Sequence, residues 1–230
     1  MKLQAFASWT HKWLALIVGV QVLFWVGSGL FFSIFPIEQV RSEHRIAQRE
    51  TAQLAAPIQD VSVLLPEAPT RVTYERDAAG EAVAVAEFAE RRPILIDLAD
   101  WRVASPLSEE AAAQIAQAYV AGSPRVRERT LVTEETPEYR GPLPAWRIAF
   151  DDGEGLAVYV AADTARVTAR RSDLWRVYDA LWALHIMDWR DHENFNSGLL
   201  ILTSFTALIV VLMGFVLFPY RMGWMRRRAG

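Results

Sequence analysis

Histidines and carboxylates near the ends of two apolar segments are the residues of this chain whose types and spacing suit metal or haem chemistry. His185, Asp188 and His192 are spaced i, i+3 and i+7, so on a helix they would share one face. His44 follows Glu43 just beyond the other apolar segment. Imidazole with carboxylate suits zinc, copper or iron. His185, Asp188, His192 and His44 are therefore candidate metal ligands.

Haem is the second chemistry that these side chains could support. Haem iron in a helical bundle needs imidazoles that face one another at equal depth. The candidate axial ligands are His11, His44, His185 and His192. No histidine lies deep in an apolar segment, but His44 could approach His185 and His192 at the outer end, where opposed imidazoles would suit haem. In an electron-transfer component, two chains would assemble a four-helix bundle with the outer histidines as ligands. Alternatively, residues 188–194 form a polar collar whose histidines are solvated or pair with carboxylates. The sequence assigns no definite cofactor.

Two apolar segments, Trp13–Ile37 and Asn194–Tyr220, contain no charged residue. Each is longer than the roughly 20 residues that cross a bilayer core as a helix. A cleaved signal peptide is an alternative for the first, but its length, its Trp residues and the lack of an Ala-x-Ala-like site favour an uncleaved anchor. We expect an α+β membrane protein with two transmembrane helices.

The charge distribution predicts the orientation of the two spans. All 27 acidic residues lie between Glu38 and Glu193, whereas the flanking cations are Lys2, Lys12, Arg221 and Arg226–Arg228. Loops next to spans are rich in Lys and Arg on the cytoplasmic side. We therefore expect both termini in the cytoplasm of a bacterial cell, two passes through its inner membrane, and the central domain in the periplasm.

The patterning divides the chain into six parts. These are a cytoplasmic tail with the first transmembrane helix (1–37), a stalk helix (38–56), a periplasmic domain (57–171), a second stalk helix (172–194), the second transmembrane helix (195–220) and a basic tail (221–230). Residues 37–54 contain no Gly or Pro, and their composition favours a polar helix. Ser172 is expected to cap a helix that continues into the second span.

Within the periplasmic domain, apolar and polar residues alternate as in strands. The expected strands are 71–74, 82–88, 94–98, 125–133, 146–150, 156–160 and 166–170, with a helix over 108–120 capped by Ser108. A weak internal similarity divides the domain into repeats of about 57–105 and 106–171. Each repeat is expected to be a helix followed by an antiparallel sheet.

The order of several short motifs resembles the PepSY and PepSY-associated transmembrane (PepSY-TM) proteins of bacteria. The motifs are residues 144–150, 158–160 with Asp163-Thr164, His11-Lys12-Trp13, Trp25 with Ser28-Gly29, and Leu184-His185. Ala165 stands where the family usually has Gly. The resemblance implies two PepSY-like repeats and a binding, regulatory or accessory role, with links to iron uptake or haem handling. Related ferric siderophore reductases imply the alternative of an electron-transfer component.

Several function classes are excluded. The chain has no cysteine and none of the Gly-x-Ser-x-Gly, His-Glu-x-x-His or phosphate-loop motifs, so we predict no enzymatic activity of its own. An acidic domain argues against nucleic acid. We expect contact with membrane lipid and with a membrane or periplasmic protein partner, or a homodimer through small residues such as Gly29 and Ser33.

Overall fold

The computed structural model describes residues 2–48, 54 and 60–223, which form two compact units. The first unit comprises residues 1–36 and 177–230, and the second comprises residues 37–176. The chain is α+β, with two long apolar helices and two four-stranded antiparallel sheets. The expected fold class is therefore confirmed at this level.

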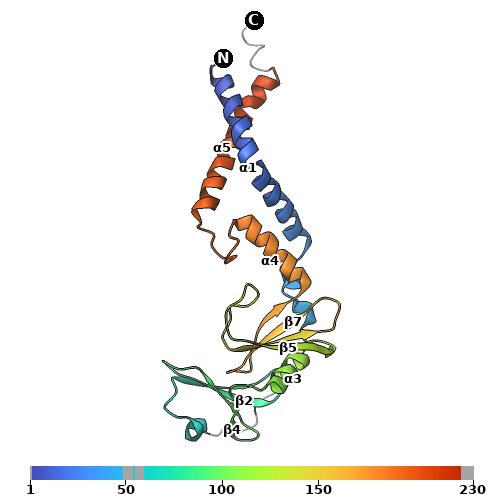
Figure 1. Cartoon of the computed structure of the whole chain (residues 1–230), viewed down its shortest axis with the longest axis vertical. Helices are drawn as coiled ribbons and strands as arrows, with labels where there is room; N and C mark the ends of the chain where they lie inside the picture. Colours follow the sequence, from blue (N-terminus) through green and yellow to red (C-terminus); the bar gives the residue numbers. More distant parts are fainter. Residues whose placement is uncertain (1, 49–53, 55–59, 224–230) are drawn as a thin grey trace. The chain divides into compact units, whose positions relative to one another are not determined.

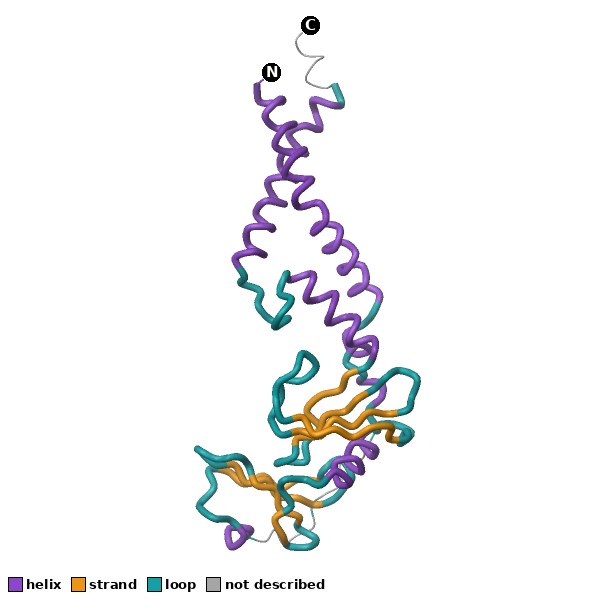
Figure 2. Tube along the Cα trace, in the orientation of Figure 1, coloured by secondary structure: helices purple, strands orange, loops and turns teal. Residues whose placement is uncertain are grey.

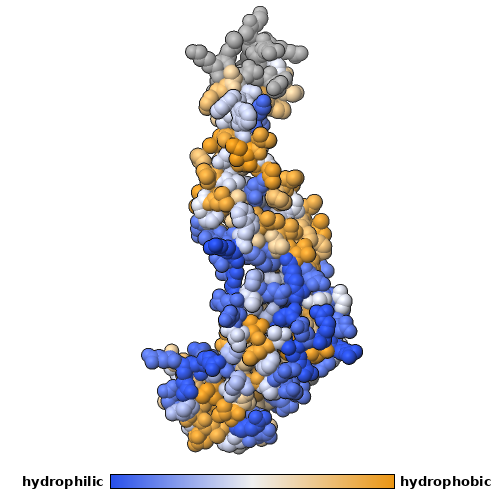
Figure 3. Space-filling model, viewed as in Figure 1, coloured by the Kyte–Doolittle hydropathy of each residue, from blue (hydrophilic) through white to orange (hydrophobic). Residues whose placement is uncertain are grey.

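The first unit is built from α1 (Lys2–Ile34) and α5 (Gly198–Arg221), which pack against each other (Figure 1). Within them, Ser8–Ile34 and Gly198–Pro219 are long and apolar enough to cross a membrane. Many of their apolar side chains are exposed, including Leu16 and Leu23, and apolar side chains gather along these helices in Figure 3. An exposed apolar surface of this kind marks a site of contact with a membrane or with another protein.

The strands of the second unit (Figure 2) form two sheets. Both sheets have the same sequential strand order. One sheet consists of β1 (Arg71–Arg76), β2 (Ala82–Glu87), β3 (Ile94–Asp97) and β4 (Arg102–Val103). The other consists of β5 (Val126–Val132), β6 (Ala145–Phe150), β7 (Ala157–Ala161) and β8 (Val167–Arg171). The seven expected strands are all present, and β4 is additional.

Successive residues of the central strands β2 and β7 are mostly apolar, and their side chains point alternately to the two faces of each sheet. Val83 and Val85 of β2 and Val158 of β7 share one core with Ile115 of α3 (Glu109–Tyr119). Ser108 caps α3 by accepting a hydrogen bond from the backbone N–H of Ala111, at 3.2 Å, as predicted. The second unit is therefore organised around α3 and the faces of both sheets.

The outer faces of the two sheets are covered by irregular segments. On the first sheet, Val61 of the short 3-10 helix η2 (Val61–Leu64) packs against Ala84 and Ile96. On the second sheet, Tyr139 packs over Tyr159, with parallel rings whose centroids are 4.5 Å apart. Every strand-rich layer is thus covered on both faces.

The prediction of a stalk helix over residues 38–56 is wrong for the part of that range that the structure describes. The chain forms only α2 (Ile37–Val40) and the 3-10 helix η1 (Glu43–Arg45), and Ile46 then pairs with Val120 as an isolated bridge. Ser42, at φ 55°, breaks the helix. Arg45 also pairs with Asp152 at 3.1 Å, so contacts with the β6–β7 turn override the helical propensity of this segment. Residues 49–53 and 55–59 lie outside the described part.

The second expected stalk helix is present but does not continue into the second span. Helix α4 (Asp173–Ile186) begins after Ser172, whose hydroxyl accepts a hydrogen bond from the Trp175 N–H at 3.3 Å, as predicted. It ends before Met187, which has φ 55°. Residues 187–197 then form a loop before α5. A left-handed residue cannot continue a right-handed helix, and this explains the break.

An ionic cluster on Glu138 holds the segment between β5 and β6 against the second sheet. Its carboxylate accepts hydrogen bonds from Arg176 Nε at 2.6 Å and Tyr159 Oη at 2.9 Å. Burial disfavours the charged carboxylate, but these hydrogen bonds and the charges of Arg176 and Arg147 outweigh it and lower the pKa of Glu138. Burial, followed by the neighbouring Glu138 charge, raises the pKa of Tyr159 to about 12.

Candidate functional site

The candidate ligands His185, Asp188 and His192 do not share a helical face. Because α4 ends at Ile186, only His185 is helical. Asp188 instead accepts backbone hydrogen bonds from Asn194, Glu193, Asp191 and Arg190, which lower its pKa to about 2. Its carboxylate therefore organises the loop. The predicted shared face is wrong because the chain turns after α4.

The three histidine side chains of the first unit each have a protein partner. His11 Nδ1 lies 3.0 Å from the carbonyl oxygen of Val210, and His192 Nδ1 lies 2.6 Å from Asp179 Oδ2. Ser28 Oγ lies 2.7 Å from His185 Nδ1, and burial lowers the pKa of His185. Only the contact of His192 with Asp179 is the pairing with a carboxylate that the polar-collar interpretation expected.

His44 belongs to the second unit and lies on η1. Its Nε2 is 3.7 Å from Glu154 Oε2, and the same carboxylate lies 2.9 Å from Arg45 Nη1. Across residues 2–48, 54 and 60–223, no three His, Asp or Glu side chains are arranged to hold a metal ion. The donor set that the sequence suggested therefore does not form a metal site within either unit.

Polar side chains inside the first apolar segment have a clear structural task. Gln21 Nε2 donates to the carbonyl of Leu184 at 2.9 Å, and Trp25 Nε1 donates to that of His185 at 2.7 Å. The last carbonyls of a helix lack intrahelical partners, so these donors cap the end of α4. The isolated polar residues in an apolar sequence were the signal that could have predicted this contact.

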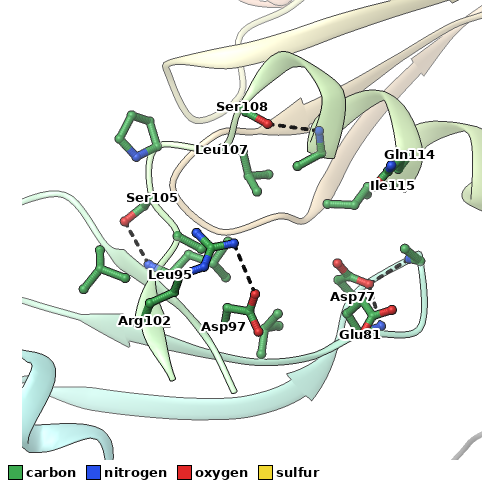
Figure 4. A pocket seen from close by; sticks show the side chains of 16 residues that line it. Asp77, Glu81, Leu95, Asp97, Arg102, Ser105, Leu107, Ser108, Gln114 and Ile115 are labelled. Carbon is green, nitrogen blue, oxygen red and sulfur yellow. Dashed lines mark hydrogen bonds and ion pairs between the residues drawn. The ribbon is translucent and has the colours of Figure 1, made fainter. Parts of the chain in front are cut away.

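A pocket of about 380 Å³ lies between the first sheet and α3 (Figure 4). Its apolar wall is formed by the side chains of Val83, Leu95, Leu107 and Ile115, all of which are buried. This size lies within the range typical of small-molecule and side-chain binding sites. The pocket is therefore the candidate functional site of the second unit.

Backbone hydrogen bonds fix the segment that forms one wall of the pocket. Leu107 N–H donates to the Ala162 carbonyl at 2.8 Å, and the Leu107 carbonyl accepts from Trp146 Nε1 at 2.9 Å. Leu95 N–H donates to Ser105 Oγ at 3.1 Å. The segment is thus tied to both sheets before α3 begins. Trp146 packs against the core and acts here as a donor.

Carboxylates dominate the polar rim of the pocket. Asp77 Oδ1 accepts from the N–H groups of Ala79 and Glu81, which orients the β1–β2 turn. Asp97 Oδ2 lies 3.5 Å from Arg102 Nη2, the one cation in the lining. Glu81 is exposed, and within the described residues its carboxylate has no hydrogen-bond or ion-pair partner. The rim therefore carries net negative charge.

Sequence reasoning missed this pocket because its residues come from separate elements. Asp77 and Glu81 read as turn residues, and Gln114 reads as an exposed position of α3. Only the packing of α3 beside β2 and β3 brings them together.

Comparison with known protein families, with curated proteins and with solved structures finds no significant match to this chain.

Proposed function

We propose that the chain is a membrane-anchored binding module that serves as a binding, regulatory or accessory subunit. In this proposal, α1 and α5 are the two transmembrane helices and the unit of residues 37–176 is the periplasmic domain. The exposed apolar side chains of both helices support the anchoring. The basic ends and the acidic middle of the sequence support the orientation, with both termini in the cytoplasm.

The observation that carries the binding role is the pocket beside α3. Its buried apolar wall and acidic rim suit a cationic group on an apolar stem. A Lys or Arg side chain has this composition, because its methylenes pack on apolar surface while its charge stays at the rim. We propose that the pocket receives such a side chain from a membrane or periplasmic protein partner. The PepSY resemblance associates this role with iron or haem handling.

Site-specific photo-crosslinking in native membranes tests this proposal. A photoreactive residue at Gln114, which lines the pocket and is exposed, should form a discrete adduct with one partner protein. The charge reversal Glu81→Lys should lower the adduct yield at least fivefold, since it removes one rim charge and adds a repulsive one.

The matched control is Glu135→Lys, which makes the same charge change at an exposed residue outside the pocket lining. It should leave the adduct yield unchanged. Equal losses in the two variants, or no adduct at Gln114, would reject the pocket as the binding site.

A haem- or metal-binding electron-transfer component assembled as a dimer is the second candidate function. The supporting observation is that His11 and His185 each engage an oxygen through Nδ1, an arrangement that orients ligand histidines. His11 and Ser28, the partner of His185, are about 25 Å apart along α1 at 1.5 Å per residue. One chain therefore cannot offer both imidazoles to one iron, and a second copy would have to supply the opposing ligand.

Visible absorption of the detergent-purified protein separates the two candidates. A Soret band that disappears in His185→Ala and His44→Ala would support the second candidate. Protein purified from haem- and metal-replete cells without a stoichiometric cofactor would reject it.

A further inference from the structure

Two adjoining cavities lie on the first unit, one between α1 and α5 and one on α5 alone. The first, of about 560 Å³, is lined by Ser8, His11 and Lys12 of α1 and by Gly214, Leu217 and Phe218 of α5. The second, of about 320 Å³, is lined by Val211, Gly214, Phe215 and Phe218. Since Gly214 and Phe218 line both, the cavities form one site with a polar end and an apolar end.

The polar end contains a cation, Lys12, that has no acidic partner among the described residues of its unit. Lys12 Nζ lies 5.5 Å from the Trp13 ring centroid, and across the described residues Lys12 forms no ion pair. Neither α1 nor α5 contains a carboxylate. An anion that binds Lys12 would therefore come from outside these helices.

His11 and Ser8 add hydrogen-bonding groups beside that cation. His11 Nδ1 donates to the Val210 carbonyl at 3.0 Å, because a carbonyl can only accept. This contact fixes the ring and leaves Nε2 as its second polar atom. Ser8 provides a hydroxyl in the same lining. The Lys12 ammonium and the Ser8 hydroxyl are donors that suit phosphate oxygens, whereas His11 Nε2 of the neutral ring is an acceptor and only borders them.

The apolar end exists because residue 214 has no side chain. A Cβ at Gly214 would lie 3.5 Å from His11 Cε1, which is an ordinary contact, but a longer side chain would enter the cavities. Phe215 and Phe218, which line the apolar end, remain exposed. An apolar groove that continues from a polar end fits an acyl chain below a phosphate headgroup and not a free phosphate.

We propose that these cavities bind one anionic phospholipid. Lys12 and Ser8 hold the phosphate headgroup, His11 lies beside it, and an acyl chain lies along Val211, Phe215 and Phe218. This inference rests on the proposed membrane anchoring and orientation, which place this end of the helices at the cytoplasmic leaflet. Anionic lipids there are attracted by nearby basic residues.

Native mass spectrometry of the full chain tests the lipid site. Released from vesicles of equal phosphatidylglycerol and phosphatidylcholine, the wild-type protein should retain one phosphatidylglycerol. Lys12→Gln should lower this occupancy about fivefold, the effect expected of one basic residue at a membrane surface. Arg71→Gln, which removes one positive charge from the other unit, should leave the occupancy unchanged.

Two further variants test the acyl groove. Gly214→Ala places a Cβ at ordinary contact distance and should retain the lipid, whereas Gly214→Leu should fill the groove and release it. Equal retention of the two lipids, or an unchanged occupancy in Lys12→Gln and Gly214→Leu, would overturn the proposal. Complete displacement by inorganic phosphate would also overturn it, because the site would then be a free-phosphate site.

Alkaline carbonate extraction separates failure of this site from failure of the anchoring. Protein that remains in carbonate-washed membranes but retains no phosphatidylglycerol would refute the lipid site alone. Protein released by the wash would refute the membrane anchor on which the site depends.

Discussion

Replacing Glu138 by Ala should destabilise the second unit by about 1.5–4 kcal/mol. The change leaves Tyr159, which is 1% exposed, with a buried hydroxyl that has lost its acceptor, at a cost of about 1–3 kcal/mol. It also removes the hydrogen bond from Arg176 Nε. Because the Arg176 side chain is partly exposed, water replaces this partner and the added loss is only about 0.5–1 kcal/mol.

Pulse proteolysis of the full chain in urea measures this change. With a slope of about 2 kcal/mol per molar urea, the midpoint for residues 37–176 should fall by about 0.75–2 M. Glu138→Gln should cost less, because its amide oxygen still accepts from Tyr159. Glu135→Ala, at an exposed position of the same connection, should stay within about 0.5 kcal/mol of wild type.

The pH dependence gives an independent check on Glu138. Its folded-state pKa lies below 4.5, so its stabilisation is complete above that pH and is lost as the pH falls through the folded-state value. The difference between wild type and Glu138→Gln should therefore shrink in acid. A Glu138→Ala midpoint equal to that of Glu135→Ala, or a difference independent of pH, would refute the reasoning.

Three further predictions concern the other contacts. The Tyr159 pKa of about 12 exceeds its ordinary value of 10, so the stability that its hydroxyl contributes is complete below pH 10 and disappears as the pH rises through 12. Tyr159→Phe should therefore flatten the fall in the urea midpoint between pH 9 and 11. An unchanged slope would contradict this. Trp25→Phe should free the His185 carbonyl and speed amide exchange at the end of α4 about fivefold, the effect of about 1 kcal/mol; Leu16→Ala, at an exposed apolar position of α1, is the control. The Asn194 amide resonance should titrate with a midpoint of about 2, reporting Asp188, and a midpoint near 3.8 would show that the loop contacts are absent.

The strands were predictable because alternation is a local property. The patterns around Val83 and Val158 place side chains on both sheet faces, and the caps at Ser108 and Ser172 follow from local hydrogen bonding. The two apolar helices follow from length and composition. These features need no knowledge of distant contacts.

The stalks and the pocket depend on contacts between distant residues and could not be predicted in this way. Residues 43–47 have helical propensity, but the ion pair of Arg45 with Asp152 and the bridge from Ile46 to Val120 determine their conformation. The prediction that the histidines share one helical face was wrong because it assumed helical spacing beyond Ile186. The helix ends there, and Met187 has a positive φ. Glu81 and Gln114 meet at the pocket only after α3 packs beside the first sheet.

The central claim is that α1 and α5 cross the membrane and hold residues 37–176 on its outer side. Single-cysteine labelling tests it without background, because the chain contains no cysteine. In intact spheroplasts, a membrane-impermeant maleimide should label Glu135→Cys, and it should label Gly230→Cys only after the membrane is permeabilised. Labelling of Gly230→Cys in intact spheroplasts, or protection of Glu135→Cys there, would contradict the account.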